Sequence, residues 1–189
     1  FNAGNAALCL TALQLLNRDL HIAISALKSL PQVPGRFEVA WHSDDKLAIV
    51  DYAHTPDAIE KVLKEIRAVQ PKRIITVFGC GGDRDPAKRP IMGQVAASQS
   101  DIVIVTDDNP RSEDPASIRN AILAGIDSAQ VSVEVIPDRR LAIRQALTLA
   151  EPGDVIAILG KGHETGQEIA GVVTPFDDRE VTREEATHA

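Results

Sequence analysis

Hydrophobic positions recur with two different periods along the chain, and the period changes near residue 35. Before that point, apolar residues follow helical spacing over residues 5–30, which predicts two helices with a break near residues 17–19. We interpret the strongly apolar stretch 6–16 as a buried helix. Residues 31–35 contain two prolines and one glycine, a composition typical of a linker, so we expect a domain to begin just after them.

Short apolar runs alternate with amphipathic helical stretches through the rest of the chain. The runs at 73–78, 102–106 and 154–159 are almost continuously apolar, which is typical of parallel strands covered on both faces. The alternation predicts an α/β fold with a Rossmann-like, mostly parallel sheet and helices on both faces. The expected elements are a hairpin pairing 37–41 with 47–51, helices at 56–69, 88–99, 115–127 and 139–150, strands at 73–78, 102–106, 131–136 and 154–159, a second hairpin within 167–175, and a short helix from Thr182.

Glycines and charged residues follow four of the expected strands. The segments are DYAH at 51–54, GCGGDRD at 79–85, DDNPR at 107–111 and GKGHE at 160–164. In a doubly wound sheet, ligands bind outside the carboxyl ends of the strands. We therefore expect these four segments to converge on one edge of the sheet.

Length and charge restrict the classes of protein that fit. The chain has 189 residues, more than the roughly 150 of an average domain, which suggests one full domain and part of another. It starts with Phe1 rather than Met, and we expect it to be a piece of a longer protein. The net charge of −7 disfavours binding to nucleic acid or to an anionic membrane. Two cysteines without a framework spacing fit a reducing cytoplasm better than a secreted scaffold.

Several familiar motifs are incomplete in this sequence. GCGGDRD has Arg84 where a dinucleotide-binding fingerprint needs its third glycine. GKGH resembles the end of a phosphate loop, but Val155 and Gly162 replace the first glycine and the hydroxyl residue of that loop. Gln167 replaces the second histidine of a zinc-protease motif, so a metal would lack a ligand there. For Cys80, a packed thiol in a turn is favoured over a nucleophile, because no base is paired with it in the nearby sequence.

The groups that remain suit a zwitterionic or anionic ligand. Arg84 and Arg111 present planar guanidinium forks that bind carboxylates, and Asp108 and Glu164 can accept hydrogen bonds from an ammonium group. Together they describe a pocket for an amino acid.

Each of these motifs also has a plainer interpretation. The segment 107–111 could form a turn and a helix cap, because Asn and Pro favour turns and a helix is expected to follow. Arg84 lies in a mixed-charge loop of a kind that is usually solvated. His54 alone would more often be structural, but beside Asp51 at a strand end it is a reasonable polar contact to a nucleotide or phosphate.

Seven motifs, taken in order, carry a resemblance to a known family. They are FNAGN at 1–5, PGRFE at 34–38, VDYAHTPDAIEK at 50–61, FGCGGDRDPAKRPIM at 78–92, TDDNPR at 106–111, GKGHE at 160–164 and FDDREV at 176–181. This series closely resembles the Mur ligases, over the whole chain. Within that family, it is most similar to the members that add meso-diaminopimelate to UDP-N-acetylmuramoyl-L-alanyl-D-glutamate (UDP-MurNAc-L-Ala-D-Glu).

The resemblance implies a division of the chain and a reaction. Residues 1–33 would be the C-terminal helices of an incomplete central ATP-binding domain, and residues 34–189 the Rossmann-like C-terminal domain. The implied reaction is ATP-dependent amide formation through an acyl phosphate, in cytoplasmic peptidoglycan precursor synthesis. ATP and Mg²⁺ would be bound mainly by the upstream part of the protein, so no metal ligand is implied in this chain and the chain alone should be inactive. We expect the protein to act as a monomer.

The resemblance also implies roles residue by residue. Arg111 would distinguish diaminopimelate from lysine, because diaminopimelate carries a second carboxylate that an arginine fork binds. His54 would be the catalytic residue, close to the γ-phosphate. The residues implied for diaminopimelate are Arg84, Asp108, Asn109, Pro110, Arg111, Gly160 and Glu164, and those implied for the ATP side are Asn5, Arg36 and Asp51.

Two other functions stay open. One is a ligase of the same family that adds lysine or another amino acid. The other is a non-catalytic α/β module that binds a nucleotide or an amino acid, which would fit the missing phosphate loop.

Overall fold

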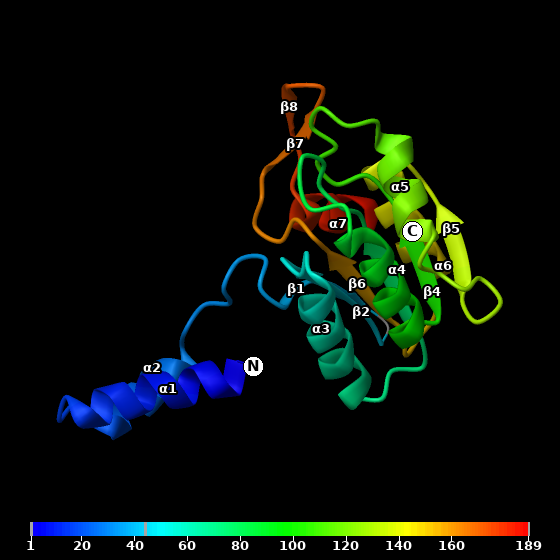
Figure 1. Ribbon diagram of the computed structural model, residues 1–189. Coiled ribbons are helices and arrows are strands. Elements are labelled where there is room, and N and C mark those ends of the chain that lie inside the picture. The colour runs from blue at the N-terminus through cyan, green and yellow to red at the C-terminus, as the bar shows by residue number, and fades with distance from the viewer. Residues whose placement is uncertain (1, 44, 189) are drawn as a thin grey trace. The chain divides into compact units, whose positions relative to one another are not determined.

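The computed structural model describes residues 2–43 and 45–188 of the chain. The chain divides between Gln32 and Val33 into two compact units (Figure 1). Within the described residues, no helix combines the length and the apolar character that crossing a membrane requires.

The first unit is a pair of helices, α1 (Asn2–Leu15) and α2 (Leu20–Lys28), so the expected break near residues 17–19 is confirmed. Asp19 caps α2, because its carboxylate accepts a hydrogen bond from the backbone N–H of His21 at 2.7 Å. The interpretation of 6–16 as a buried helix is wrong in this structure, since Leu8 and Leu15 are 71% and 79% exposed. Two short helices have too little surface between them to bury so many apolar side chains.

The second unit is built on a six-stranded sheet with the order β1-β2-β6-β3-β4-β5. β1 pairs with β2 in antiparallel fashion and the remaining neighbours are parallel, which confirms the mostly parallel α/β fold. A separate antiparallel pair, β7 and β8, follows the last strand of the sheet. The elements are β1 (Glu38–Ser43), β2 (Lys46–Asp51), α3 (Pro56–Ala68), β3 (Ile74–Phe78), α4 (Lys88–Gln99), β4 (Ile102–Val105), α5 (Pro115–Leu123), β5 (Ser132–Val135), α6 (Arg139–Leu149), β6 (Val155–Leu159), β7 (Gly166–Ile169), β8 (Val172–Pro175) and α7 (Asp178–Glu185).

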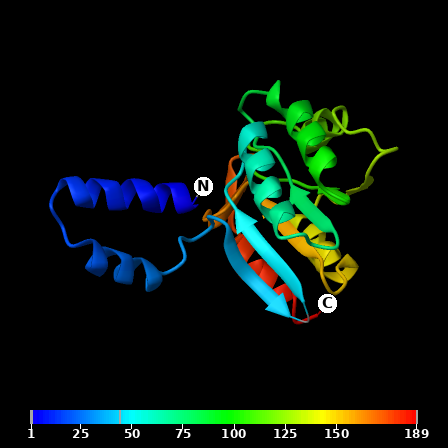
Figure 2. The same ribbon diagram turned by 90° about the horizontal axis from the view of Figure 1, so that it is seen from below.

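Helices cover both faces of the sheet (Figures 1 and 2). Successive side chains of a strand point to opposite faces. In β6, Val155, Ala157 and Leu159 pack into the core under α3, α4 and α5, whereas Ile156 and Ile158 pack into the core under α6 and α7. All five positions of β3 and of β6 are buried, which explains why their sequences are almost continuously apolar, with Thr76 as the one polar residue.

Two helix boundaries differ from the expectation. α5 ends at Leu123 rather than near 127. α7 begins at Asp178, four residues before Thr182, because Asp177 caps it by accepting a hydrogen bond from the N–H of Arg179 at 2.9 Å. The start of α7 could not be predicted from the sequence, because its first turn is polar. Asp178 in that turn is nevertheless buried, since it pairs with an arginine that is distant in the sequence.

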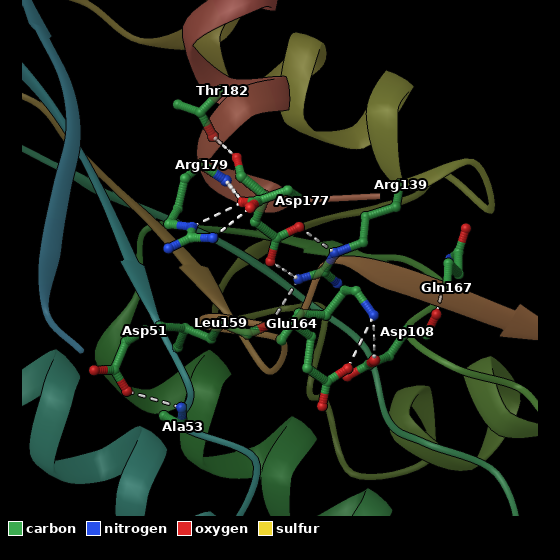
Figure 3. A network of polar contacts seen from close by, with 12 residues as sticks. Asp51, Ala53, Asp108, Arg139, Leu159, Glu164, Gln167, Asp177, Arg179 and Thr182 are labelled. Atoms are coloured by element: carbon green, nitrogen blue, oxygen red, sulfur yellow. Dashed lines mark hydrogen bonds and ion pairs between the residues drawn. The ribbon is translucent and has the colours of Figure 1, made fainter. Parts of the chain in front are cut away.

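That arginine is Arg139, at the first position of α6. Its Nε and Nη2 donate to the two carboxylate oxygens of Asp178 at 2.8 and 2.7 Å, and Nη2 also donates to the carbonyl oxygen of Leu159 at 3.0 Å (Figure 3). Both charged side chains are fully buried. One guanidinium therefore joins α6, α7 and the end of β6.

We expect Arg139→Met to destabilise the second unit by about 3–5 kcal/mol, because it leaves the Asp178 carboxylate buried without its partner. Urea unfolding followed by fluorescence measures the change, since the single tryptophan, Trp41, lies in β1 of this unit. The control is Lys61→Met, which removes an exposed ion pair with Asp57 one helical turn away and should change stability by no more than about 0.5 kcal/mol. Equal losses in the two variants would contradict the role assigned to Arg139.

Candidate functional site

The four polar segments converge at the carboxyl edge of the sheet, as the sequence predicts. The strands β2, β6, β3 and β4 are consecutive parallel neighbours, so the loops that follow them lie side by side. These loops enclose a cleft of about 200 Å³. Of the residues predicted at the site, those that line the cleft are His54, Arg84, Asp108, Asn109, Arg111, Gly160 and Glu164.

Asn109 connects the loop after β4 to the loop after β6. Its Nδ2 donates to Glu164 Oε2 at 2.8 Å, and its Oδ1 accepts from Lys161 Nζ at 3.1 Å and from the backbone N–H of Glu168 at 3.0 Å. The residue is buried, so its side of each of these bonds is shielded from water, although Glu164 is one-third exposed. Asn109 thereby fixes the position of Glu164, and Pro110 follows it without lining the cleft itself.

Arg111 stands at the rim of the cleft on a strained backbone. Its φ of 53° lies in the left-handed region, where residues other than glycine are uncommon. The position is held by β7, because Arg111 N–H donates to Glu168 O at 3.1 Å and Ala170 N–H donates to Arg111 O at 2.7 Å. The guanidinium Nη1 donates to Gly82 O at 2.7 Å, and Nε lies 3.5 Å from Glu168 Oε2. The charged group is therefore presented between two loops.

Arg84 is exposed, on a loop that is anchored to the segment after Arg111. Asp83 receives hydrogen bonds from Ser112 Oγ at 2.6 Å, and its own N–H donates to Glu113 Oε1 at 2.6 Å. Gly82 permits this approach, because a Cβ there would lie 1.9 Å from Pro110 O. The two arginines thus belong to loops with a defined mutual position.

Two acids that line the cleft, Asp108 and Glu164, share one buried lysine. Lys161 is fully buried, with Nζ 3.2 Å from Glu164 Oε2 and 3.6 Å from Asp108 Oδ1. Figure 3 shows the two carboxylates directed toward the same region, beside Arg139. Burial raises the pKa of the Asp108 carboxyl, and the positive charges of Arg139 and Lys161 oppose that rise. The sequence analysis missed Lys161, although it lies within GKGHE, because that lysine looked like part of an incomplete phosphate loop.

The residues predicted on the ATP side have different surroundings. Asp51 is buried and does not line the cleft, and its oxygens accept hydrogen bonds from the N–H groups of Phe37 at 2.7 Å and Ala53 at 2.8 Å, so it holds these two segments together. Burial also raises the pKa of Asp51. His54 Nδ1 lies 2.8 Å from the carbonyl oxygen of Tyr52.

Tyr52 is a second residue that the sequence analysis missed. It lines the cleft, its ring lies 4.5 Å from that of His54, and the guanidinium of Arg36 lies 4.7 Å from its ring centroid. Its place in VDYAH, directly after a buried strand, was the available signal. Asn5 belongs to the first unit, on α1, where it is exposed, and its role stays a prediction.

The helix-cap interpretation of segment 107–111 is wrong. α5 is capped by Asp114, whose carboxylate accepts from the N–H groups of Ala116 at 3.3 Å and Ser117 at 3.0 Å. Asp107 forms an ion pair with Arg119 of the same helix instead. Asp108 and Asn109 are left to face the cleft.

A metal site is not formed by the described part of the chain. Across residues 2–43 and 45–188, no three His, Cys, Asp or Glu side chains converge in a way that could hold a metal ion. Gln167, the residue that breaks the zinc-protease motif, donates to the carbonyl oxygen of Asp108 at 2.8 Å. Its amide supports the loop after β4.

Known proteins similar to this chain point to one family. A family profile described as "Mur ligase, glutamate ligase domain" matches residues 35–162. A UDP-N-acetylmuramoyl-L-alanyl-D-glutamate–2,6-diaminopimelate ligase of Chelativorans sp. (strain BNC1) is 49% identical over 97% of this chain and 37% of its own length. A ligase with the same name from Chromobacterium violaceum is 44% identical over 99% of this chain and 38% of its own length.

A solved structure of a ligase with the same name superimposes with a TM-score of 0.79 at 42% identity, covering 95% of this chain and 37% of that one. The chain therefore spans well under half of the length of these relatives.

The geometry also predicts the reactivity of the two thiols. Cys80 is buried with its Sγ 3.6 Å from Met92 Sδ, and burial raises its pKa to about 12, whereas Cys9 is exposed. Because the thiolate is the reactive form, we expect iodoacetamide at pH 8 to label Cys9 in the native chain and Cys80 only after denaturation. Mass spectrometry of the labelled peptides measures both. Fast labelling of Cys80 in the native chain would contradict the packed-thiol interpretation.

Proposed function

This chain belongs to the Mur ligase family, and we propose that it is the C-terminal part of the ligase that adds meso-diaminopimelate to UDP-MurNAc-L-Ala-D-Glu. The enzyme would act as a monomer in the cytoplasm, in peptidoglycan precursor synthesis. The two relatives described above carry that activity in their names at 44–49% identity, which supports the assignment.

The observation that carries the proposal is the set of charges in one cleft. Arg84 and Arg111 line it from two loops, and Asp108 and Glu164 line the same cleft. Diaminopimelate has two carboxylates and two ammonium groups, so it needs guanidinium forks and acidic acceptors in one place. Lysine lacks one of those carboxylates and would leave an arginine without its partner.

These residues would position the attacking amine. The acceptors Asp108 and Glu164 bind an ammonium group, and the arginines fix the far carboxylate, so the rest of the substrate has one orientation. The carboxylate that reacts is that of D-Glu in UDP-MurNAc-L-Ala-D-Glu. It is a poor electrophile, and ATP supplies its activation when bound. His54 and Tyr52 line the same cleft from the loop after β2, which supports the placement of the nucleotide side there.

We assign ATP and Mg²⁺ mainly to the part of the enzyme upstream of this chain. The first unit, α1 and α2, would be the end of the central ATP-binding domain, and Asn5 would contribute to the nucleotide side from it. The partial coverage of the relatives supports this division, because most of their length has no counterpart in the chain. The described residues contain no group of three His, Cys, Asp or Glu side chains that could hold a metal ion, and no step is assigned to a metal here.

We expect Arg111→Ala in the full-length ligase to raise KM for diaminopimelate about ten- to hundredfold, because a charge-assisted hydrogen bond contributes about 1.5–3 kcal/mol. KM for ATP should be nearly unchanged. Arg111→Lys keeps the charge but not the planar fork of the guanidinium. Its KM for diaminopimelate should therefore lie between those of the unmutated ligase and Arg111→Ala. Steady-state kinetics with each substrate varied in turn measure the effects.

A distant arginine provides the control for this experiment. Arg67, in the last turn of α3, contacts Gln99 O and Asp101 away from the cleft, so Arg67→Ala should leave both KM values unchanged. A substrate panel tests the specificity itself. Equal turnover of lysine and diaminopimelate by the unmutated ligase would overturn the assignment of the substrate and favour a ligase for another amino acid.

We expect the isolated 189-residue chain to form no amide and to show no saturable binding of ATP at micromolar concentrations. Both results follow from the assignment of the phosphate loop to the upstream part. Isothermal titration calorimetry and an assay for released phosphate measure them. Tight ATP binding would contradict the division of labour and favour a free-standing binding module, and amide formation by the chain would show that the upstream part is dispensable.

A further inference from the structure

Lys161 is a buried lysine whose ammonium group contacts three residues that line the cleft. The end of β6 carries it inward, because Gly160 has a φ of 116° and approaches Asp108 so closely that a Cβ at this position would lie 2.8 Å from Asp108 Oδ2. The following turn is closed by a hydrogen bond of 3.0 Å from Glu164 N–H to Lys161 O. With its side chain at 0% exposure, the lysine has no free path to a ligand in the cleft.

Every contact of the ammonium group is to a residue assigned to the amino-acid substrate. Lys161 Nζ lies 3.1 Å from Asn109 Oδ1, 3.2 Å from Glu164 Oε2 and 3.6 Å from Asp108 Oδ1. Glu164 Oε2 is shared with Asn109 Nδ2 at 2.8 Å. The lysine is thus the common partner of the three groups that form one wall of the cleft.

Charge explains why the wall needs a cation. Asp108 is buried and Glu164 is two-thirds covered, so two negative charges close together would be costly without a counter-charge. The positive charge of Arg139 also acts on Asp108, but the guanidinium forms its ion pair with Asp178, whereas Lys161 Nζ lies within 3.6 Å of both Asp108 and Glu164. One lysine against two carboxylates leaves one net negative charge, which matches a single incoming ammonium group.

We propose that Lys161 is a positioning residue for the amino-acid substrate, holding Asp108, Asn109 and Glu164 in the arrangement that receives the ammonium group. This inference rests on the proposed function. The sequence GKG suggests a phosphate-binding lysine. We assign Lys161 a different role, because its ammonium group contacts carboxylates of the fold.

The test uses the full-length ligase and the variant Lys161→Met, which keeps the apolar stem and removes the charge. We expect KM for diaminopimelate to rise at least about tenfold, the effect of losing a charge-assisted hydrogen bond. KM for ATP and for UDP-MurNAc-L-Ala-D-Glu should stay within about twofold, since neither depends on this wall. The double variant Lys161→Met/Glu164→Gln should show less than the combined effect of the single changes, because the two side chains act as one unit.

The matched control lies at the other end of the same strand. Asp154 directly precedes β6 and is fully buried against Arg73, with Oδ2 2.6 Å from Nη2. Asp154→Asn should lower the unfolding temperature of the ligase and leave all three KM values unchanged. A purely structural Lys161 would behave in the same way as this control.

Each outcome decides the matter. A rise of KM for ATP as large as that for diaminopimelate, or a loss of thermal stability with unchanged KM values, overturns the proposal. If Lys161→Met does not fold, Lys161→Gln gives the same readout, and failure of both variants to fold assigns the lysine to the fold alone. Failure of the unmutated ligase to use diaminopimelate is a separate result, which refutes the proposed function and not the role of Lys161.

Discussion

The buried ion pair between Arg139 and Asp178 is the contact on which the carboxyl edge of the sheet depends. The same guanidinium binds the carbonyl oxygen of Leu159, the last residue of β6, so α6, α7 and the central strand meet at one side chain (Figure 3). A buried pair adds little net stability over a well-packed apolar replacement, because both charges lose their hydration. Its two-pronged geometry does supply direction, since a guanidinium and a carboxylate pair in a defined plane. Lys161 follows Leu159 by only two residues. The anchored end of β6 therefore helps to position Lys161 and the two carboxylates that it contacts, those of Asp108 and Glu164.

Local charge, rather than net charge, explains how an acidic chain can offer a site to an anionic substrate. The net charge of −7 acts over distances at which salt screens it, whereas the cleft acts at contact distance. Arg111 is kept in place by the carbonyl oxygen of Gly82 and by the Glu168 carboxylate at 3.5 Å, a separation that leaves its positive charge only partly compensated. The acids Asp108 and Glu164 both lie within 3.6 Å of the Lys161 ammonium group. The cleft therefore contains both signs of charge at fixed positions, which suits a zwitterion and suits neither a polyanion nor an apolar ligand.

The sheet and the location of the site could be predicted from sequence, because both follow from local patterns. A strand such as β6 is apolar at every position, and the rule that ligands bind at the carboxyl ends of parallel strands identifies the edge. The direction of individual side chains could not be predicted. Asp51 does not line the cleft, and its carboxylate instead accepts a hydrogen bond from the N–H of Phe37, fourteen residues earlier. Lys161 points inward because Asp108 and its neighbour, more than fifty residues earlier, approach the end of β6. Such orientations depend on tertiary contacts between segments that are far apart in the sequence, and hydrophobic periodicity gives no information about those contacts.

The element that follows GKGHE explains why this loop differs from a phosphate loop of similar composition. A phosphate loop leads into a helix, whose first backbone N–H groups and dipole bind the phosphates, and its lysine extends toward the same ligand. Here the loop leads into β7, so no helix N-terminus is available at this strand end. The counter-charge of the lysine comes from the carboxylates of Asp108 and Glu164, as a buried ammonium group requires. The same short sequence of glycines and lysine therefore pairs its lysine with carboxylates of the fold in this setting and with a bound phosphate in a phosphate loop.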